Sequence, residues 1–227
     1  MGLLHSIVAY HRGHLTGLQS DQRDFSPYVA HFTSWSAMRP LRNLIGAGHD
    51  AGATAGLLDQ ADRESWNVVQ LIWASQKLLA RSPSERDSLP PCVCLSECTL
   101  PGLISHCERY GRFGFAFRKS DVFRVGGRPC IYLAPDEYGF LASHGRGKSS
   151  QTPEGRLYAL SNVYVPPRGP NKVQDYTHER EWRVFADIDL RAVPAAVVIA
   201  PSLYAAQASK LTECPVIPID TLFDWGA

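Results

Sequence analysis

Two carboxylates near the end of the chain, Glu179 and Glu181, have the type and spacing to act together on one substrate. They lie in a segment that begins polar and continues with the alternation typical of a β-strand. Successive side chains of a strand point to opposite faces, so Glu179, Glu181 and Arg183 are expected to share one face. Trp182 and Val184 are then expected on the opposite face, facing a core.

This acidic face has two interpretations. Like charges two residues apart on a strand repel each other, and they need either solvent or a cationic partner. In the first interpretation the face is exposed and is neutralised by Arg180 and Arg183. In the second, Glu179 and Glu181 form a Glu-x-Glu site that stabilises a developing positive charge. The residues alone leave both interpretations open.

Polar residues at the ends of other predicted strands are candidates for the same site. His31 and Thr33 share a face of a short strand over residues 28–34, and Ser96 ends a strand over residues 92–96. Tyr110 follows a short predicted helix. Polar groups at the ends of several strands are the pattern that a cleft would show. For His31, a hydrogen-bonded histidine in the core is an equally good interpretation.

Other motifs are weaker. The run 145–149 contains Gly, Arg, Lys and Ser but lacks the glycine spacing of a phosphate-binding loop. Cys92, Cys94 and Cys98 precede His106, but no second Cys-x-x-Cys pair completes a zinc site, so we expect free thiols and no metal. A nucleophilic Cys94–His106 pair lacks an oxyanion hole and a third orienting group. The sequence has no evident cluster of Asp and Glu residues that could bind Mg²⁺, so it gives little support to a nuclease.

The pattern of the whole chain predicts a single α+β domain over residues 25–227, with a mixed or antiparallel central sheet and flanking helices. Residues 1–24 are polar and are expected to be a loosely docked lead-in. Helices are expected after residue 40, at 62–81, at 101–110 and at 203–211. Further strands are expected at 111–118, 129–133, 182–185, 195–199 and 216–219. The Gly-rich residues 46–56 are expected to form a loop, residues 143–155 a mobile insert or lid, and residues 166–170 a rigid connector.

Composition excludes several classes of protein. The 227 residues carry a net charge of +1, which gives no global field to attract nucleic acid or an anionic membrane. No apolar run approaches the roughly 20 residues of a membrane-spanning helix. The first residues lack the pattern of a secretory signal, so we expect a cytoplasmic protein.

A series of short motifs, in order over about residues 28–185, resembles the AbiGi-type abortive-infection proteins of bacteria. The motifs are His31-Phe32-Thr33, Cys94-Leu95-Ser96-Glu97, Tyr110-Gly111-x-Phe113-Gly114-Phe115-x-Phe117-x-Lys119, Pro129-x-Ile131-Tyr132 and Glu179-Arg180-Glu181-Trp182-Arg183. The resemblance implies a role in phage defence, in a locus that couples a toxic activity to its control. A partner protein from the same locus is therefore expected.

A more distant resemblance is to the ADP-ribosyltransferase fold, especially its DarT-like members that modify DNA. It implies that NAD is the substrate that donates the ADP-ribosyl group. It also implies that His31 holds NAD with Thr33 beside it, and that Ser96 or Tyr110 orients NAD. Glu181 would then be the catalytic residue, and Glu179 would orient the acceptor nucleophile.

Two functions are therefore expected from the sequence. The first is an anti-phage effector that uses NAD to modify a macromolecule, either nucleic acid or protein. The alternative is a non-catalytic antitoxin or sensor that binds a nucleotide or a partner protein of the defence locus.

Overall fold

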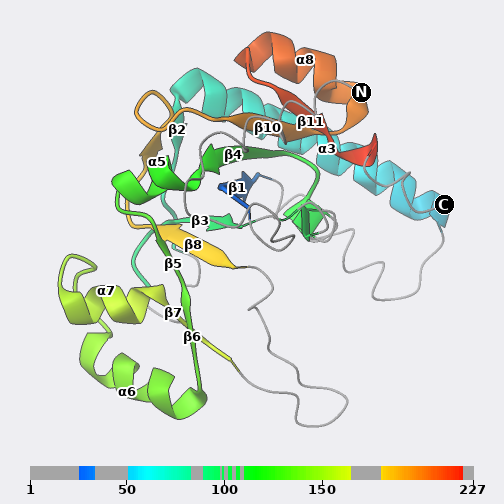
Figure 1. The fold of residues 1–227 in the computed structure, drawn as a ribbon. Coiled ribbons are helices and arrows are strands. Elements are labelled where there is room, and N and C mark those ends of the chain that lie inside the picture. The colour runs from blue at the N-terminus through cyan, green and yellow to red at the C-terminus, as the bar shows by residue number, and fades with distance from the viewer. Residues whose placement is uncertain are drawn as a thin grey trace.

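The fold is built on one seven-stranded sheet in which the strands neighbouring each other are mostly antiparallel. The computed structural model describes residues 26–33, 51–82, 89–97, 99, 102–103, 106–107, 110–164 and 180–221. Within them the strand order of this sheet is β11-β10-β4-β1-β3-β8-β5, and β10–β11 is the one parallel pair in it (Figure 1). The strands are β1 (Tyr28–Phe32), β3 (Val93–Ser96), β4 (Gly114–Arg118), β5 (Arg128–Pro129), β8 (Glu181–Val184), β10 (Val197–Ala200) and β11 (Val216–Pro218).

Helices and two small sheets surround this sheet. The helices are α3 (Ala51–Ser75), α5 (Lys119–Arg124), α6 (Pro135–Gly145), α7 (Pro153–Leu160) and α8 (Ser202–Thr212). The strand β2 (Lys77–Leu78) pairs with β9 (Ile188–Asp189), and β6 (Ile131–Leu133) pairs in parallel with β7 (Ser161–Val163). The single α+β domain with a mixed, mostly antiparallel sheet and flanking helices confirms the expected fold class.

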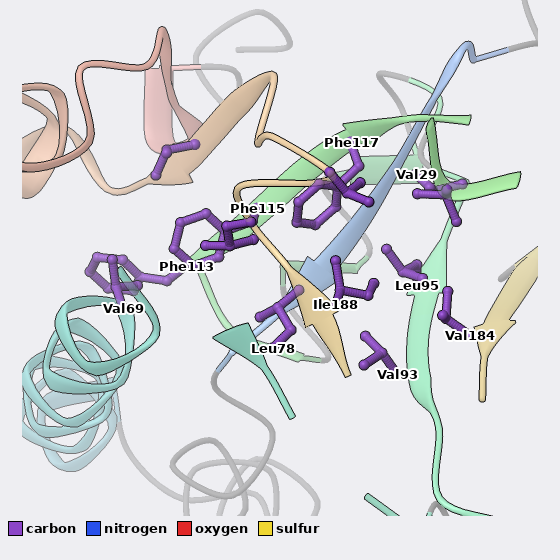
Figure 2. Close-up of a cluster of buried hydrophobic side chains, with 14 of the residues drawn as sticks. Val29, Val69, Leu78, Val93, Leu95, Phe113, Phe115, Phe117, Val184 and Ile188 are labelled. Carbon is purple, nitrogen blue, oxygen red and sulfur yellow. The ribbon is translucent and has the colours of Figure 1, made fainter. Parts of the chain in front are cut away.

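One face of the sheet carries the larger hydrophobic core. Phe113 precedes β4, Phe115 and Phe117 lie in it, and all three are fully buried, as their alternation predicts (Figure 2). Helix α3 covers this face with Val69, and Trp73 of the same helix stacks on Phe115 with ring centroids 6.3 Å apart. Helix α8 packs there too. The apolar side chains on one side of α3 therefore pack against the apolar side chains on one face of β4.

The opposite face carries a second, smaller cluster. Ala30, Ala116 and Val197 face it from neighbouring strands, and Leu103 and Cys107 of the short helical segment near residues 102–110 pack on it. This segment confirms the short helix expected at 101–110 at those of its residues that the structure describes.

A smaller unit of α6, α7, β6 and β7 lies beside the β8–β5 edge (Figure 1). Its two helices approach closely at Gly145, where an added Cβ would lie only 2.5 Å from the Cβ of Tyr158. Thr152 begins α7 by accepting a hydrogen bond from the Gly155 amide, 3.2 Å long, and Pro153 follows at the first helical position.

The structure corrects four expected elements. The long helix spans 51–75 rather than 62–81, so the expectation of a loop is wrong for residues 51–56. The helix ends where Gln76 takes a left-handed conformation, with φ of 55°. The apolar spacing in the sequence continues to Leu79, so it gave no sign of this earlier end. Residues 143–155 are wrongly predicted as a lid, because they are the end of α6, a turn and the start of α7. The strand expected at 129–133 is broken at Cys130 between two sheets.

Three further expectations fall outside the described residues. They are the lead-in at 1–24, the helix after residue 40 and the connector at 166–170.

Candidate functional site on strand β8

The site begins with a paired carboxylate and guanidinium two residues apart on β8. Arg183 Nε donates to Glu181 Oε1 over 2.8 Å, and Arg183 Nη2 donates to Oε2 over 3.0 Å. Both side chains leave the same face of the strand, as the alternation predicts. The Arg183 side chain is 4% exposed and that of Glu181 is 13% exposed, so this is a buried ion pair with two parallel hydrogen bonds.

The smaller unit supplies the remaining hydrogen-bond partners of this pair, Asn162 and Ala159, and we call these two residues the cage of the ion pair. Asn162 of β7 donates its amide to Glu181 Oε2 over 2.8 Å, and its carbonyl oxygen accepts from Arg183 Nη2 over 2.8 Å. Arg183 Nη1 also donates to the main-chain carbonyl of Ala159, at the end of α7, over 2.6 Å. The ion pair therefore fastens the smaller unit to the main sheet.

The electrostatics keep Glu181 ionised. Burial alone would raise the pKa of its carboxyl group, but the charge of Arg183 and the hydrogen bonds from Arg183, Asn162 and Cys94 lower that pKa below its ordinary value. The pKa of Arg183 is raised by the carboxylate, despite burial. A carboxylate fixed in this way is a poor proton donor. It suits the stabilisation of a positive charge on a neighbouring group.

Ser96 lies next to Glu181. The two residues are register partners in the β3–β8 ladder, and on the other side Ser96 pairs with Ala30 of β1. Register partners point to the same face, so Ser96 and Glu181 project together, and Cys94 and Arg183 are the next pair on that face. The strands β1, β3 and β8 are consecutive neighbours in the sheet (Figure 1).

His31 lies at the seam between β1 and β3. It alternates with Ala30 and pairs with Phe115, which places it on the face of the larger core, opposite to Ser96 and Glu181. The two strands pair only at Ala30 and Ser96. Next to this pair, the carbonyl oxygen of Cys94 has the ring of His31 as its partner, with Nδ1 2.9 Å away. Burial lowers the pKa of His31, which favours its neutral form. Strand alternation does not bring His31 to the Glu181 face.

Two other predicted site residues, Thr33 and Tyr110, make contacts away from the Glu181–Arg183 pair. The hydroxyl of Thr33 is 3.4 Å from the carbonyl oxygen of Phe113, to which it donates. The ring of Tyr110 stacks on Phe32, with centroids 6.3 Å apart. Glu179 lies outside the described residues. Arg180, which one interpretation assigned to neutralising the acidic face, has its guanidinium 3.5 Å from Glu97 instead.

The structure adds partners that the sequence did not indicate. Asn162 was missed, and its only signal was a polar residue inside a short β-like run. Three thiols, those of Cys92, Cys94 and Cys130, also gather beside the ion pair, and the sulfur atoms of Cys92 and Cys94 are 3.7 Å apart. All three are free cysteines. Within the described ranges, no group of three or more His, Cys, Asp or Glu side chains is arranged to hold a metal ion.

The comparisons with known proteins give no relative. No family model, curated protein or solved structure matches this chain. Among the helices of the described residues, none combines the length and the apolar character needed to cross a lipid bilayer. The function must therefore be argued from the site.

Proposed function

We propose that this chain is an ADP-ribosyltransferase-like protein of bacterial phage defence, which uses NAD to modify a nucleic acid or a protein. In this proposal Glu181 is the catalytic carboxylate and Ser96 orients NAD beside it. The observation that supports it best is the adjacency of Ser96 and Glu181 on one face, with the ionised state of Glu181 maintained by Arg183.

The chemistry fits a fixed carboxylate. Breaking the bond between nicotinamide and ribose builds positive charge on the ribose ring, as in glycoside hydrolysis. A carboxylate that is already ionised and oriented stabilises this charge without reorganising. The lowered pKa of Glu181 suits this electrostatic role and does not suit a general acid.

The ribose hydroxyl must compete for a place on Glu181. Oε1 accepts from Arg183, and Oε2 accepts from both Arg183 and Asn162. Asn162 is the neutral donor, so its bond is weaker than those from the guanidinium and is the one that a hydroxyl group of NAD would replace. Because His31 faces the other side, its role in holding NAD requires movement at the β1–β3 seam.

A second candidate function is favoured by the same cage. Both oxygen atoms of the carboxylate already accept from protein donors, which suits a structural role in which Glu181 holds the smaller unit on the sheet. The chain would then be the non-catalytic antitoxin or sensor of a defence locus, binding a nucleotide or a partner protein.

The experiment that separates the two functions combines biochemistry with phage protection. Purified protein is incubated with NAD labelled in the adenylate portion, with a bacterial lysate as the source of acceptors, and both nicotinamide release and label transfer are measured. Glu181→Gln, Glu179→Gln and Ser96→Ala are tested in parallel. Asp189→Asn is the matched control, since its carboxylate also pairs with an arginine two residues away but is on the surface.

The catalytic proposal expects wild-type protein and Asp189→Asn to release nicotinamide. Glu181→Gln should lower that rate by about 100-fold or more, the loss typical of removing an electrostatic group from a site. Circular dichroism must show that the variant is folded. Failure of the wild-type protein to release nicotinamide with any acceptor, together with intact phage protection by folded Glu181→Gln, would overturn the proposal and leave the binding function.

A further inference from the structure

The pair Cys92 and Cys94 has a geometry that neither candidate function uses. They are separated by Val93, which is buried on the other face, so the side chains of Cys92, just before β3, and Cys94, within it, lie side by side on the Glu181 face. Their sulfur atoms are 3.7 Å apart, within the distance of a hydrogen bond between thiols. The Cys92 residue is 4% exposed, while Cys94 is half-buried.

The surroundings give the two thiols different reactivities. The contact between the two thiols, aided by the charge of Arg183, lowers the pKa of Cys92. The same contact and burial raise the pKa of Cys94. Because the thiolate is the nucleophile, the lowered pKa favours Cys92 as the first thiol to react, and the Cys94 sulfur, 3.7 Å away, is placed to resolve the product.

We propose that Cys92 and Cys94 form a peroxide-sensitive dithiol that closes to a disulfide at the start of β3. In the first step the Cys92 thiolate attacks one oxygen of the peroxide, the O–O bond breaks, and a sulfenic acid forms with release of hydroxide. In the second step the Cys94 sulfur attacks the sulfenic sulfur, the S–O bond breaks and water leaves. Two thiols are oxidised by two electrons in total, and one peroxide is reduced.

Closure requires the start of β3 to move. Residues two apart on an extended strand have Cα atoms about 6.7 Å apart, at the upper end of the range that a disulfide spans. Cys92 is held by two hydrogen bonds to Arg81, 2.9 and 3.0 Å long, in an isolated bridge. It follows Pro90 and Pro91, which have no N–H to donate to a ladder. The chain can therefore shift there at the loss of one bridge.

Oxidation at this dithiol reaches the Glu181 site. Cys94 is the register partner of Arg183, and its thiol is one of the donors that lower the pKa of Glu181. A disulfide removes this S–H donor and moves the start of the strand that ends at Ser96. The dithiol therefore couples an oxidising signal to the candidate site, whichever of the two functions the site performs.

The test is differential alkylation of the full chain. Purified protein is treated with hydrogen peroxide and then unfolded in denaturant, so that iodoacetamide reaches and blocks every free thiol. Reversibly oxidised thiols are afterwards reduced and labelled with N-ethylmaleimide. We expect two of the six thiols to be lost to the first reagent and recovered by the reductant. Fragment-ion mass spectrometry should place the maleimide on Cys92 and Cys94.

Variants give the specificity of the pairing. Cys92→Ser and Cys94→Ser should each abolish the reversible loss of two thiols. Cys130→Ser should preserve it, and so should Cys214→Ser, whose thiol lies elsewhere and bonds the carbonyl oxygen of Ala195. Maleimide on any other pair, or a loss that the reductant does not recover, would overturn the proposal. Labelling of the wild-type protein needs no variant to fold and does not depend on NAD chemistry, so its result is separate from that of the proposed function.

Discussion

Breaking the Glu181–Arg183 pair should strongly destabilise the protein. In Glu181→Gln the cation of Arg183 stays in place with its side chain only 4% exposed, and it keeps neutral oxygen partners on Asn162 and Ala159. An amide at position 181 can offer one oxygen, but its NH₂ group then faces a donor of Arg183 or Asn162. Leaving a buried charge without its partner costs about 3 to 5 kcal/mol. For a chain of this size that corresponds to a fall in Tm of roughly 6 to 20 °C.

Urea unfolding measures this cost, and a double-mutant cycle assigns it to the pair. Arg183→Met alone should also destabilise, because it leaves the carboxylate with Asn162 as its main neutral donor. The double variant removes both charges, so its cost should fall below the sum of the single costs by about 2 kcal/mol. A cost for Glu181→Gln under about 1 kcal/mol, which is typical of an exposed pair, or strict additivity in the cycle, would refute the buried ion pair.

The pH dependence of the same variant follows from the lowered pKa of Glu181. The carboxylate contributes stability that is fully present above the ordinary carboxyl pKa of 4.5 and is lost as the pH falls through the lower pKa of the folded state. The difference in unfolding free energy between wild type and Glu181→Gln should therefore be largest near neutral pH and shrink below pH 4.5. Urea titrations at a series of pH values check this, and a difference that grows in acid would contradict it.

Three other substitutions, one of them with a matched control, test the fold around the site by urea unfolding. Gly145→Ala should cost about 1 to 3 kcal/mol of unfolding free energy, because its Cβ would meet Tyr158. Gly139→Ala, the control on the same helix, has no atom within 4 Å of the added Cβ and should stabilise by up to about 1 kcal/mol. Equal effects of the two substitutions would contradict the close α6–α7 contact. Arg112→Met should cost about 1 to 3 kcal/mol, because it leaves the carboxylate of Asp62, 7% exposed, without its guanidinium partner, and a neutral result would show that solvent replaces it. Phe117→Ala should cost about 3 to 5 kcal/mol as a cavity in the larger core, and a cost below 1 kcal/mol would mean that the ring is not buried there.

Part of the candidate site could be predicted because it depends on local geometry. Arg183 lies two residues from Glu181 on one strand, and this period alone places their side chains together. Phe113, Phe115 and Phe117 are buried for the same reason. The helix α8, predicted at 203–211 between two strands, is found at Ser202–Thr212.

Other parts of the site depend on which strands pair and in what register. Ser96 meets Glu181 because β3 and β8 align at that residue, and a shift of one residue would have turned it to the other face. His31 was expected beside them as another polar strand residue, but its register with Phe115 turns it away. The catalytic and NAD-binding roles of these residues stay predictions.

By itself the sequence determined the class of fold, the alternation of β8 and the apolar rows of β4 and α3, because side-chain period is a property of a few consecutive residues. Only the tertiary structure decided that Asn162, 19 residues before Glu181, completes its cage, and that the thiols of Cys92 and Cys94 gather beside it. These contacts join segments whose approach is fixed by the packing of the smaller unit on the sheet edge, and the free energy of that packing is spread over many residues.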